Sequence, residues 1–158
     1  MTTRTRTRRR RSAAFTLIEM IAVLVIIGLI LGIGIPTFMK RIEQGRQTNA
    51  MAQTQLMYQA ACSFNMDVGH YPSEEQGLMA LLEQPADADR WGGPYIENWT
   101  KIPLDGWGNE YKYMFFTDDN GRDFAKVICL GKDGLPGGSG LKADIVNGEV
   151  MEEADEGM

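Results

Sequence analysis

The sequence predicts an α+β protein in which one long N-terminal helix packs against a small antiparallel sheet. An apolar run over residues 15–35, followed by a helically periodic run from Thr37, predicts the helix. Two segments that alternate apolar and polar residues around a turn signal predict the sheet. The helix needs that sheet, because an apolar stripe on one helix face must be covered by another element. A chain of 158 residues has room for one such domain and short appendages.

The charges are divided unequally along the chain. Six of the 16 basic residues are arginines within residues 1–14, so the net charge of −5 becomes −11 once this segment is set aside. A basic block could be a nucleic-acid-binding arm, but one directly before an apolar span is better explained by the positive-inside rule. We therefore expect no nucleic-acid partner.

Residues 15–36 form the expected membrane-spanning segment. As a helix, the apolar run would span roughly 30 Å, which is the thickness of the hydrocarbon core of a bilayer. The small pair Ala13-Ala14 precedes the run, whereas a secretory signal has its small residues after it, so the run is expected to stay in the protein. With the arginines in the cytoplasm, the chain after about Lys40 lies across the membrane.

Glu19 is the only acid in the apolar run. An ionised carboxylate at that depth costs about 2.5 kcal/mol or more, so the first interpretation is a functional residue with a cationic partner. The alternative is an acid that is tolerated near the membrane face and has no such role.

Residues 15–19, Phe-Thr-Leu-Ile-Glu, lie behind a short basic leader and resemble the prepilin signal of the type IV pilin and pseudopilin family. The resemblance implies that a prepilin peptidase cuts between Ala14 and Phe15 and methylates the new amino terminus. Ala14 departs from the family, which usually has glycine before the cut. The freed amine of Phe15, four residues or about 6 Å away, or that of a neighbouring subunit would be the partner of Glu19. Breaking such a buried pair costs about 3–5 kcal/mol, so Glu19 would align subunits during assembly.

From Thr37 the chain has the pattern of an amphipathic helix that ends near Gly69. Its apolar stripe is expected to face the sheet and consists of Leu56, Met57, Ala60, Ala61 and Phe64. The polar positions are Lys40, Arg41, Glu43, Arg46 and Gln47. Helix breakers are expected to weaken the preceding stretch, since glycine costs about 1 kcal/mol against alanine and proline about 3 kcal/mol. These breakers are Gly28, Gly32, Gly34 and Pro36.

Behind the long helix, Ser73 and Gln76 have the spacing of a capping box and predict a short second helix over residues 74–82. Residues 85–100 have no clear periodicity and are expected to form a loop. We expect strands over residues 111–116 and 124–130, joined through a turn at residues 118–121. Cys62 and Cys129 could pair outside the cytoplasm, or they could be two small buried side chains.

Two segments, residues 69–82 and 103–111, closely resemble the corresponding parts of the major pseudopilins of type II secretion systems. The second matches the pattern Pro-x-Asp-Pro-Trp-Gly-x-x-Tyr, with Gly106 in place of the second proline. The resemblance covers about Ser12 to Asn147 and implies a type IV pilin-like fold. It makes residues 1–14 the leader and 37–148 the periplasmic domain. The acidic tail that remains, residues 149–158, is expected to be solvated because its charges repel one another.

Residues 130–140, Leu-Gly-Lys-Asp-Gly-Leu-Pro-Gly-Gly-Ser-Gly, form a glycine-rich segment. It lacks the Gly-Lys-Ser/Thr element of a phosphate-binding loop and the alternating acids of an EF-hand. The resemblance implies a calcium site with two carboxylates and one backbone carbonyl as ligands: Asp133, Asp144 and Leu130. We add the hydroxyl of Ser139, because calcium takes six to eight oxygens. Lys142-Ala143 stands where many relatives have a further acid or Asn, and this difference predicts weaker calcium binding. The alternative interpretation of the segment is an ordinary glycine-rich turn without a metal.

The resemblance implies a structural subunit without enzymatic activity, anchored in the inner membrane by a single pass. Such a subunit polymerises with itself through residues 15–35 into a pseudopilus that drives export of folded proteins across the outer membrane. The implied partners are minor pseudopilins, prepilin peptidase and the inner-membrane assembly platform with its ATPase. The ATPase would have to supply the energy, because no nucleotide-binding motif occurs in this sequence. One alternative is a type IV pilin for adhesion, motility or DNA uptake. The other alternative is a membrane-anchored hydrolase. The sequence argues against it, because it has only one histidine and no visible nucleophile–base arrangement.

Overall fold

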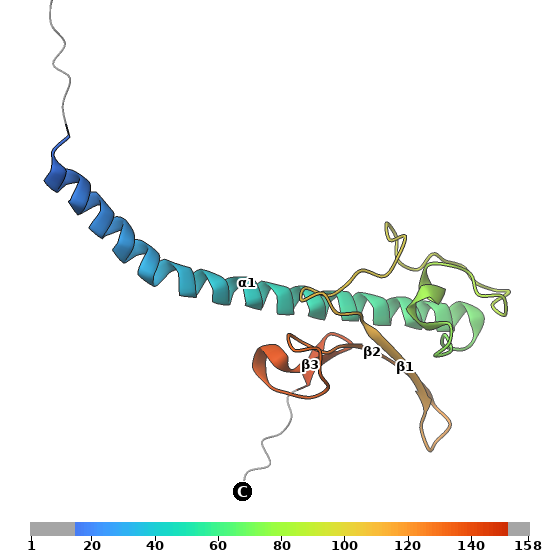
Figure 1. Ribbon diagram of the computed structural model, residues 1–158. Helices are drawn as coiled ribbons and strands as arrows, with labels where there is room; N and C mark the ends of the chain where they lie inside the picture. The colour runs from blue at the N-terminus through green and yellow to red at the C-terminus, as the bar shows by residue number, and fades with distance from the viewer. Residues whose placement is uncertain (1–14, 152–158) are drawn as a thin grey trace, which may run out of the picture. The chain divides into compact units, whose positions relative to one another are not determined.

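The computed structural model describes residues 15–151 of the chain. Their elements follow in this order: α1 (Leu17–Val68), η1 (Gly77–Leu81), β1 (Lys112–Thr117), β2 (Asp123–Cys129), η2 (Gly140–Lys142), β3 (Asp144–Val146) and β4 (Glu149–Met151), where η marks a 3-10 helix (Figure 1). The chain divides into two compact units after Lys40, and α1 belongs to both. The expected α+β fold, with a long helix and a small antiparallel sheet, is confirmed.

The first unit contains the N-terminal part of α1, whose apolar side chains are exposed, with Leu17 81% and Leu24 67% accessible. This is a helix long and apolar enough to cross a membrane, and none of its most apolar window is buried. The helix continues without interruption past the four residues that the sequence predicts to weaken it: Gly28, Gly32, Gly34 and Pro36. Helix propagation is cooperative, so the hydrogen-bonded turns on either side carry the helix through these positions although proline removes one backbone hydrogen bond.

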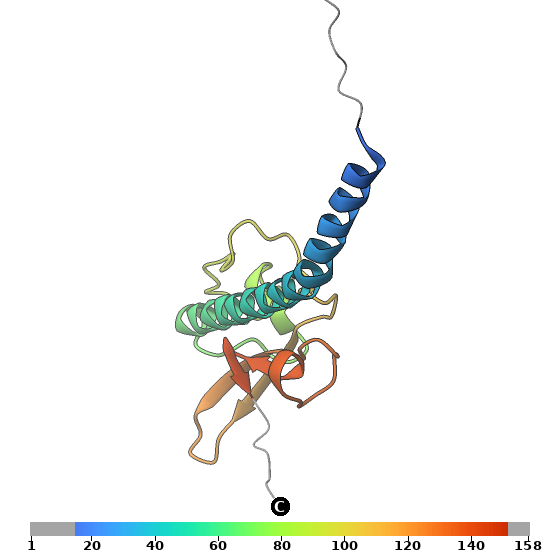
Figure 2. The ribbon, with the colours of Figure 1, turned by 90° about the vertical axis from the view of Figure 1, so that its left-hand side faces the viewer.

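In the second unit, the C-terminal half of α1 lies against a four-stranded antiparallel sheet in the order β1-β2-β3-β4. Both ribbon views show the sheet on one side of this half of α1 and the loop before β1 on the other (Figures 1 and 2). β1 and β2 pair from Lys112 with Ile128 to Thr117 with Asp123, around the predicted turn. The two predicted strands are confirmed to within one residue at each end.

β3 and β4 are strands that the sequence did not predict. Each has three residues, which is too short for an alternating pattern to identify a strand. β4 pairs with β3 through Val150 opposite Ile145, so the sheet includes residues 149–151 of the segment expected to be a solvated tail. The remainder of that segment lies outside the described residues.

The predicted apolar stripe of α1 is confirmed at four of its five positions. The buried members are Met57, Ala60, Ala61 and Phe64. Leu56 is 41% exposed, and its assignment to the stripe was wrong. The stripe instead runs through Ala50 and Thr54 to Met57, at the spacing of three and four residues that one helix face requires.

The predicted helix over residues 74–82 is shorter and of a different type. The capping box is present: Ser73 N–H donates to Gln76 Oε1 at 2.9 Å, and Gln76 N–H donates to Ser73 Oγ at 3.3 Å. The residue that follows, Gly77, has a φ of +56°. A left-handed residue cannot continue a right-handed α-helix, so the capped turn ends there and the 3-10 helix η1 follows.

Candidate functional site

Glu19 lies in the first turn of α1. Thr16 directly precedes the helix, and its hydroxyl accepts a hydrogen bond from the backbone N–H of Glu19 at 3.3 Å. Thr16 is therefore the N-cap. The spacing Thr-x-x-Glu is that of a capping box, so the sequence contained the signal for this residue.

Within residues 15–151, Glu19 makes no ion pair, and its side chain is exposed. A negative charge in the first helical turn gains about 0.3–1 kcal/mol from the helix dipole. That gain is smaller than the cost of about 2.5 kcal/mol or more for placing the charge in lipid, so the helix dipole alone does not compensate for an ionised Glu19 there. Phe15 begins the described chain and is 73% exposed, whereas Ala14, the predicted residue before the cut, lies outside it.

Asp105 is a buried carboxylate that organises the loop before β1. Its Oδ1 accepts hydrogen bonds from the backbone N–H groups of Trp107 at 2.9 Å and Asn109 at 2.8 Å. Its Oδ2 accepts from the side-chain amide of Asn109 at 3.4 Å and from the thiol of Cys129 at 3.2 Å. These four donors make burial of the carboxylate tolerable.

Cys129 is a donor in the core and forms no disulfide with Cys62, since both cysteines are free. Burial raises the pKa of the Cys129 thiol to about 12, and its hydrogen bond to Asp105 adds to the increase. The thiol is therefore protonated at neutral pH and can donate. Of the two sequence-based alternatives, Cys129 follows the second, a small buried side chain.

Glu43 connects two loops to α1. Its carboxylate accepts a hydrogen bond from the indole N–H of Trp107 at 2.9 Å and lies 3.4 Å from Lys132 Nζ. The bond from Trp107 is the largest of the effects that lower the pKa of Glu43. One turn further along α1, the side-chain amide of Gln47 donates to the carbonyl of Gly140 at 3.0 Å. The loop before β1 and the C-terminal loop, which is the segment of residues 130–143 between β2 and β3, thus share one turn of α1.

Asp144, at the start of β3, is the best-placed of the predicted metal ligands. Its Oδ2 accepts a hydrogen bond from Gly137 N–H at 3.0 Å, whereas its Oδ1 is buried without a hydrogen-bond partner. A buried carboxylate oxygen without a donor is unfavourable, and a bound cation would remove that penalty. The chemistry of this atom fits a hard cation.

The other predicted ligands are arranged less favourably. Asp133 accepts a hydrogen bond from Leu135 N–H at 3.3 Å and lies 3.9 Å from Lys142 Nζ. Ser139 is exposed, and Leu130, directly after β2, has a buried side chain. In the part of the chain that the structure describes, no group of three or more His, Cys, Asp or Glu side chains could hold a metal. A site here would need backbone carbonyls beside two carboxylates.

Two glycines let the C-terminal loop fold closely on itself. A Cβ on Gly131 or on Gly138 would lie 2.8 Å from the carbonyl oxygen of Lys142. Both glycines also have positive φ angles, +64° and +91°, which other residues rarely adopt. The Lys142 carbonyl is therefore held inside the loop, two residues before Asp144.

Comparison with known proteins identifies the family. Residues 37–148 match the family model described as type II secretion system (T2SS), protein G. This chain belongs to the T2SS protein G family. Residues 9–35 also match the prokaryotic N-terminal methylation motif.

Individual protein G relatives match over most of their length. The type II secretion system core protein G of Pseudomonas aeruginosa is 36% identical over 145 residues, which cover 88% of this chain and 96% of the relative. The protein of the same name from Vibrio cholerae is 33% identical over 147 residues, covering 90% and 96%. The crystal structure of the major pseudopilin of enterohaemorrhagic Escherichia coli has the same fold, with a TM-score of 0.51, 23% identity and coverage of 70% of this chain and 92% of that one.

Membership of the protein G family favours the secretion interpretation over a type IV pilus. The family consists of pseudopilins, which are structural subunits that associate with themselves and with other T2SS components. The methylation motif and the apolar helix indicate a membrane anchor. Glu43 was not identified from the sequence, because its partner Trp107 is 64 residues away. Asp105 has local donors, but its contact with Cys129, 24 residues away, depends on the fold.

Proposed function

We propose that this chain polymerises into the T2SS pseudopilus through the helix of residues 15–35. The observation that carries the proposal is the exposure of apolar side chains along this helix, while residues 41–151 have a core of their own. A helix that is hydrophobic all round belongs in lipid or among other helices. The same surface would serve the subunit stored in the inner membrane and the subunit packed in the filament. The growing filament would drive folded proteins across the outer membrane.

In the proposed filament, Glu19 aligns neighbouring subunits. A prepilin peptidase cuts between Ala14 and Phe15 and methylates the new amine, as the match to the N-terminal methylation motif supports. A neighbour displaced along the filament axis brings its own Phe15 amine to the carboxylate. Because an unpaired buried charge costs about 3–5 kcal/mol, only the register that forms this pair is stable.

The full-length variant Glu19→Leu tests this role. Leucine removes the charge and keeps the helix apolar, so we expect the variant to be inserted and cut but to lose filament formation and secretion by about tenfold or more. Mass spectrometry of the amino terminus measures the cut, and sedimentation of the polymer measures assembly. Met20→Leu, which changes the neighbouring position without a change of charge, is the matched control. A Glu19→Leu protein that is cut and still assembles normally would contradict the role.

The proposed topology is a single pass. Residues 1–14 lie in the cytoplasm, where their six arginines keep them, and residues 37–148 lie in the periplasm. The inner-membrane assembly platform and its ATPase would supply the energy for polymerisation, and minor pseudopilins would be the other subunits. The chain itself would catalyse no reaction.

We further propose that the C-terminal loop binds calcium. The unpartnered Oδ1 of Asp144 supports this, and Asp133, Ser139 and the Leu130 carbonyl would complete the protein ligands. When bound, the ion would neutralise the two carboxylates and hold the loop closed. The proximity of Lys142 Nζ to Asp133 would weaken binding, because the ammonium group repels the incoming cation.

A further inference from the structure

The face of β1 and β2 that points away from α1 carries an aromatic patch. Phe116 and Phe124 are cross-strand partners whose rings stack with centroids 5.4 Å apart, and they are 38% and 37% exposed. Met114 beside them is 47% exposed. Lys126 Nζ lies 4.9 Å from the centre of the Phe116 ring and forms no ion pair within residues 15–151. These four residues are the aromatic patch.

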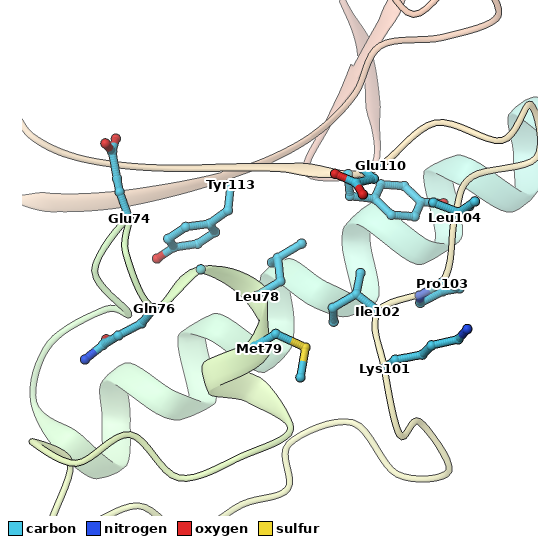
Figure 3. Close-up of a pocket in the computed structure, with 12 residues that line it drawn as sticks. Glu74, Gln76, Leu78, Met79, Lys101, Ile102, Pro103, Leu104, Glu110 and Tyr113 are labelled. Carbon is cyan, nitrogen blue, oxygen red and sulfur yellow. The ribbon is translucent and has the colours of Figure 1, made fainter.

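A pocket of about 400 Å³ opens between η1, the loop before β1 and the first residues of β1. Its apolar lining consists of Leu78, Met79, Ile102, Pro103, Leu104, Tyr111 and Tyr113. Figure 3 shows Leu78 and Ile102 between Glu74 and Glu110 on one side and Lys101 on the other. Neither acid forms an ion pair in the described chain. This is the acidic pocket.

We propose that the aromatic patch of one subunit docks into the acidic pocket of a second copy of this chain. The stacked phenylalanine rings match the apolar lining. The two acids of the pocket outnumber its one lysine, Lys101, so the pocket carries a net negative charge that matches the unpaired Lys126. Complementary charges of this kind select the partner and its orientation. This contact rests on the proposed function, because it presupposes that the chain polymerises.

The occupant must come from another molecule. Tyr113 lines the pocket and Phe116 belongs to the patch, and residues at odd and even positions of one strand point to opposite faces of the sheet. A subunit therefore cannot fill its own pocket with its own patch. A contact between two different surfaces is heterologous, and its repetition generates an open filament when the rotation does not close a ring.

Charge reversal in the full-length chain tests the docking. Lys126→Glu alone, or Glu74→Lys with Glu110→Lys, places like charges at the contact and should lower the yield of sedimentable filament by about fivefold or more. The variant with all three changes restores opposite charges and should regain most of the wild-type yield. Glu97→Lys, an exposed acid outside the pocket, is the control and should leave the yield unchanged. The melting temperatures of all variants should stay near that of the wild type, because these positions are exposed.

The outcomes separate the docking contact from the proposed function. If the wild type polymerises and Glu19→Leu does not, but the reversals have no effect or the triple variant remains as poor as the single ones, the docking is wrong and the proposed function stands. Rescue of Lys126→Glu by lysines in the pocket of a different pseudopilin, and not in this chain, would assign the contact to that subunit and overturn docking between copies. A wild-type chain that forms no polymer would contradict both.

Discussion

Asp144 provides the sharpest test of the proposed calcium site. Calcium at about 100 times its dissociation constant would stabilise the folded state by about 2.7 kcal/mol. We therefore expect calcium to raise the melting temperature of the full-length protein in detergent by several degrees over the value in chelator. Asp144→Ala should abolish the increase, because it removes a buried carboxylate oxygen that has no hydrogen-bond partner among the described residues.

The control for this experiment is Asp119→Ala, an exposed acid in the β1–β2 turn. It removes the same charge from the chain and should leave the calcium response intact. Equal calcium responses in wild type and Asp144→Ala would contradict the site. Absence of any response in the wild type would identify the loop as a glycine-rich turn.

Cys129 predicts a loss of stability at alkaline pH. The thiol ionises near pH 8.5 in an unfolded chain, whereas burial raises its pKa in the folded protein to about 12. Above the lower value the unfolded state loses its proton first, so the free energy of unfolding falls as the pH rises. By pH 9.5 the wild type should lose about 1.4 kcal/mol more than Cys129→Ala, measured by chemical denaturation under reducing conditions. Identical pH slopes in the two proteins would show that the thiol does not contribute.

The polar contacts that fix the loops could be predicted only in part. Asp133 and Asp144 are only eleven residues apart in the sequence, within and directly after one glycine-rich segment, so their proximity could be predicted. It does not show that Glu43 holds Trp107 and Lys132, because those contacts depend on the folded positions of three separate segments. Trp107 lies in residues 103–111, which resemble a known family, but that resemblance does not reveal that Trp107 contacts Glu43.

At the level of elements, two glycines predict opposite effects of the same substitution. Gly45 lies inside α1 with open space around it, so Gly45→Ala should stabilise the protein by about 1 kcal/mol through helix propensity. Gly77 also faces open space but has a φ of +56°, so Gly77→Ala should destabilise it by about 1 kcal/mol through backbone strain. Thermal unfolding of the two full-length variants measures both effects. A stabilising Gly77→Ala would show that this left-handed turn is not required.

α1 and the β1–β2 hairpin were predictable because their signals are local. The helix has a long periodic pattern, and the hairpin has two alternating segments around a turn closed by Asp118, whose Oδ1 accepts from Arg122 N–H at 2.8 Å. β3 and β4 are three residues each and become strands only by pairing with β2 and with each other. The capping-box pattern does not specify the positive φ of Gly77, at which the capped turn ends and η1 begins.

At the level of the whole molecule, Ala14 predicts the rate of processing. At the proposed prepilin peptidase cut, glycine has no side chain to fit beside the bond and restricts the backbone least, so Ala14→Gly should be cut faster than the wild type. Pulse-chase labelling in cells, with gel mobility as the measure of the cut, would show a shorter half-life of the uncut form. Ala13→Gly makes the same change one position further from the bond and should have a smaller effect. Equal half-lives for wild type and Ala14→Gly would contradict the prediction.

The anchoring of two loops at Glu43 and Gln47 also has a mechanical consequence. The apolar run ends at Ile35, so only residues 36–42 separate it from the first point at which the loops are attached to α1. A force on either loop would therefore reach α1 through Glu43 and Gln47, within about two to three helical turns of the end of the apolar run. Because α1 is continuous through residues 36–42, a force on either loop would reach the apolar run along the axis of this helix.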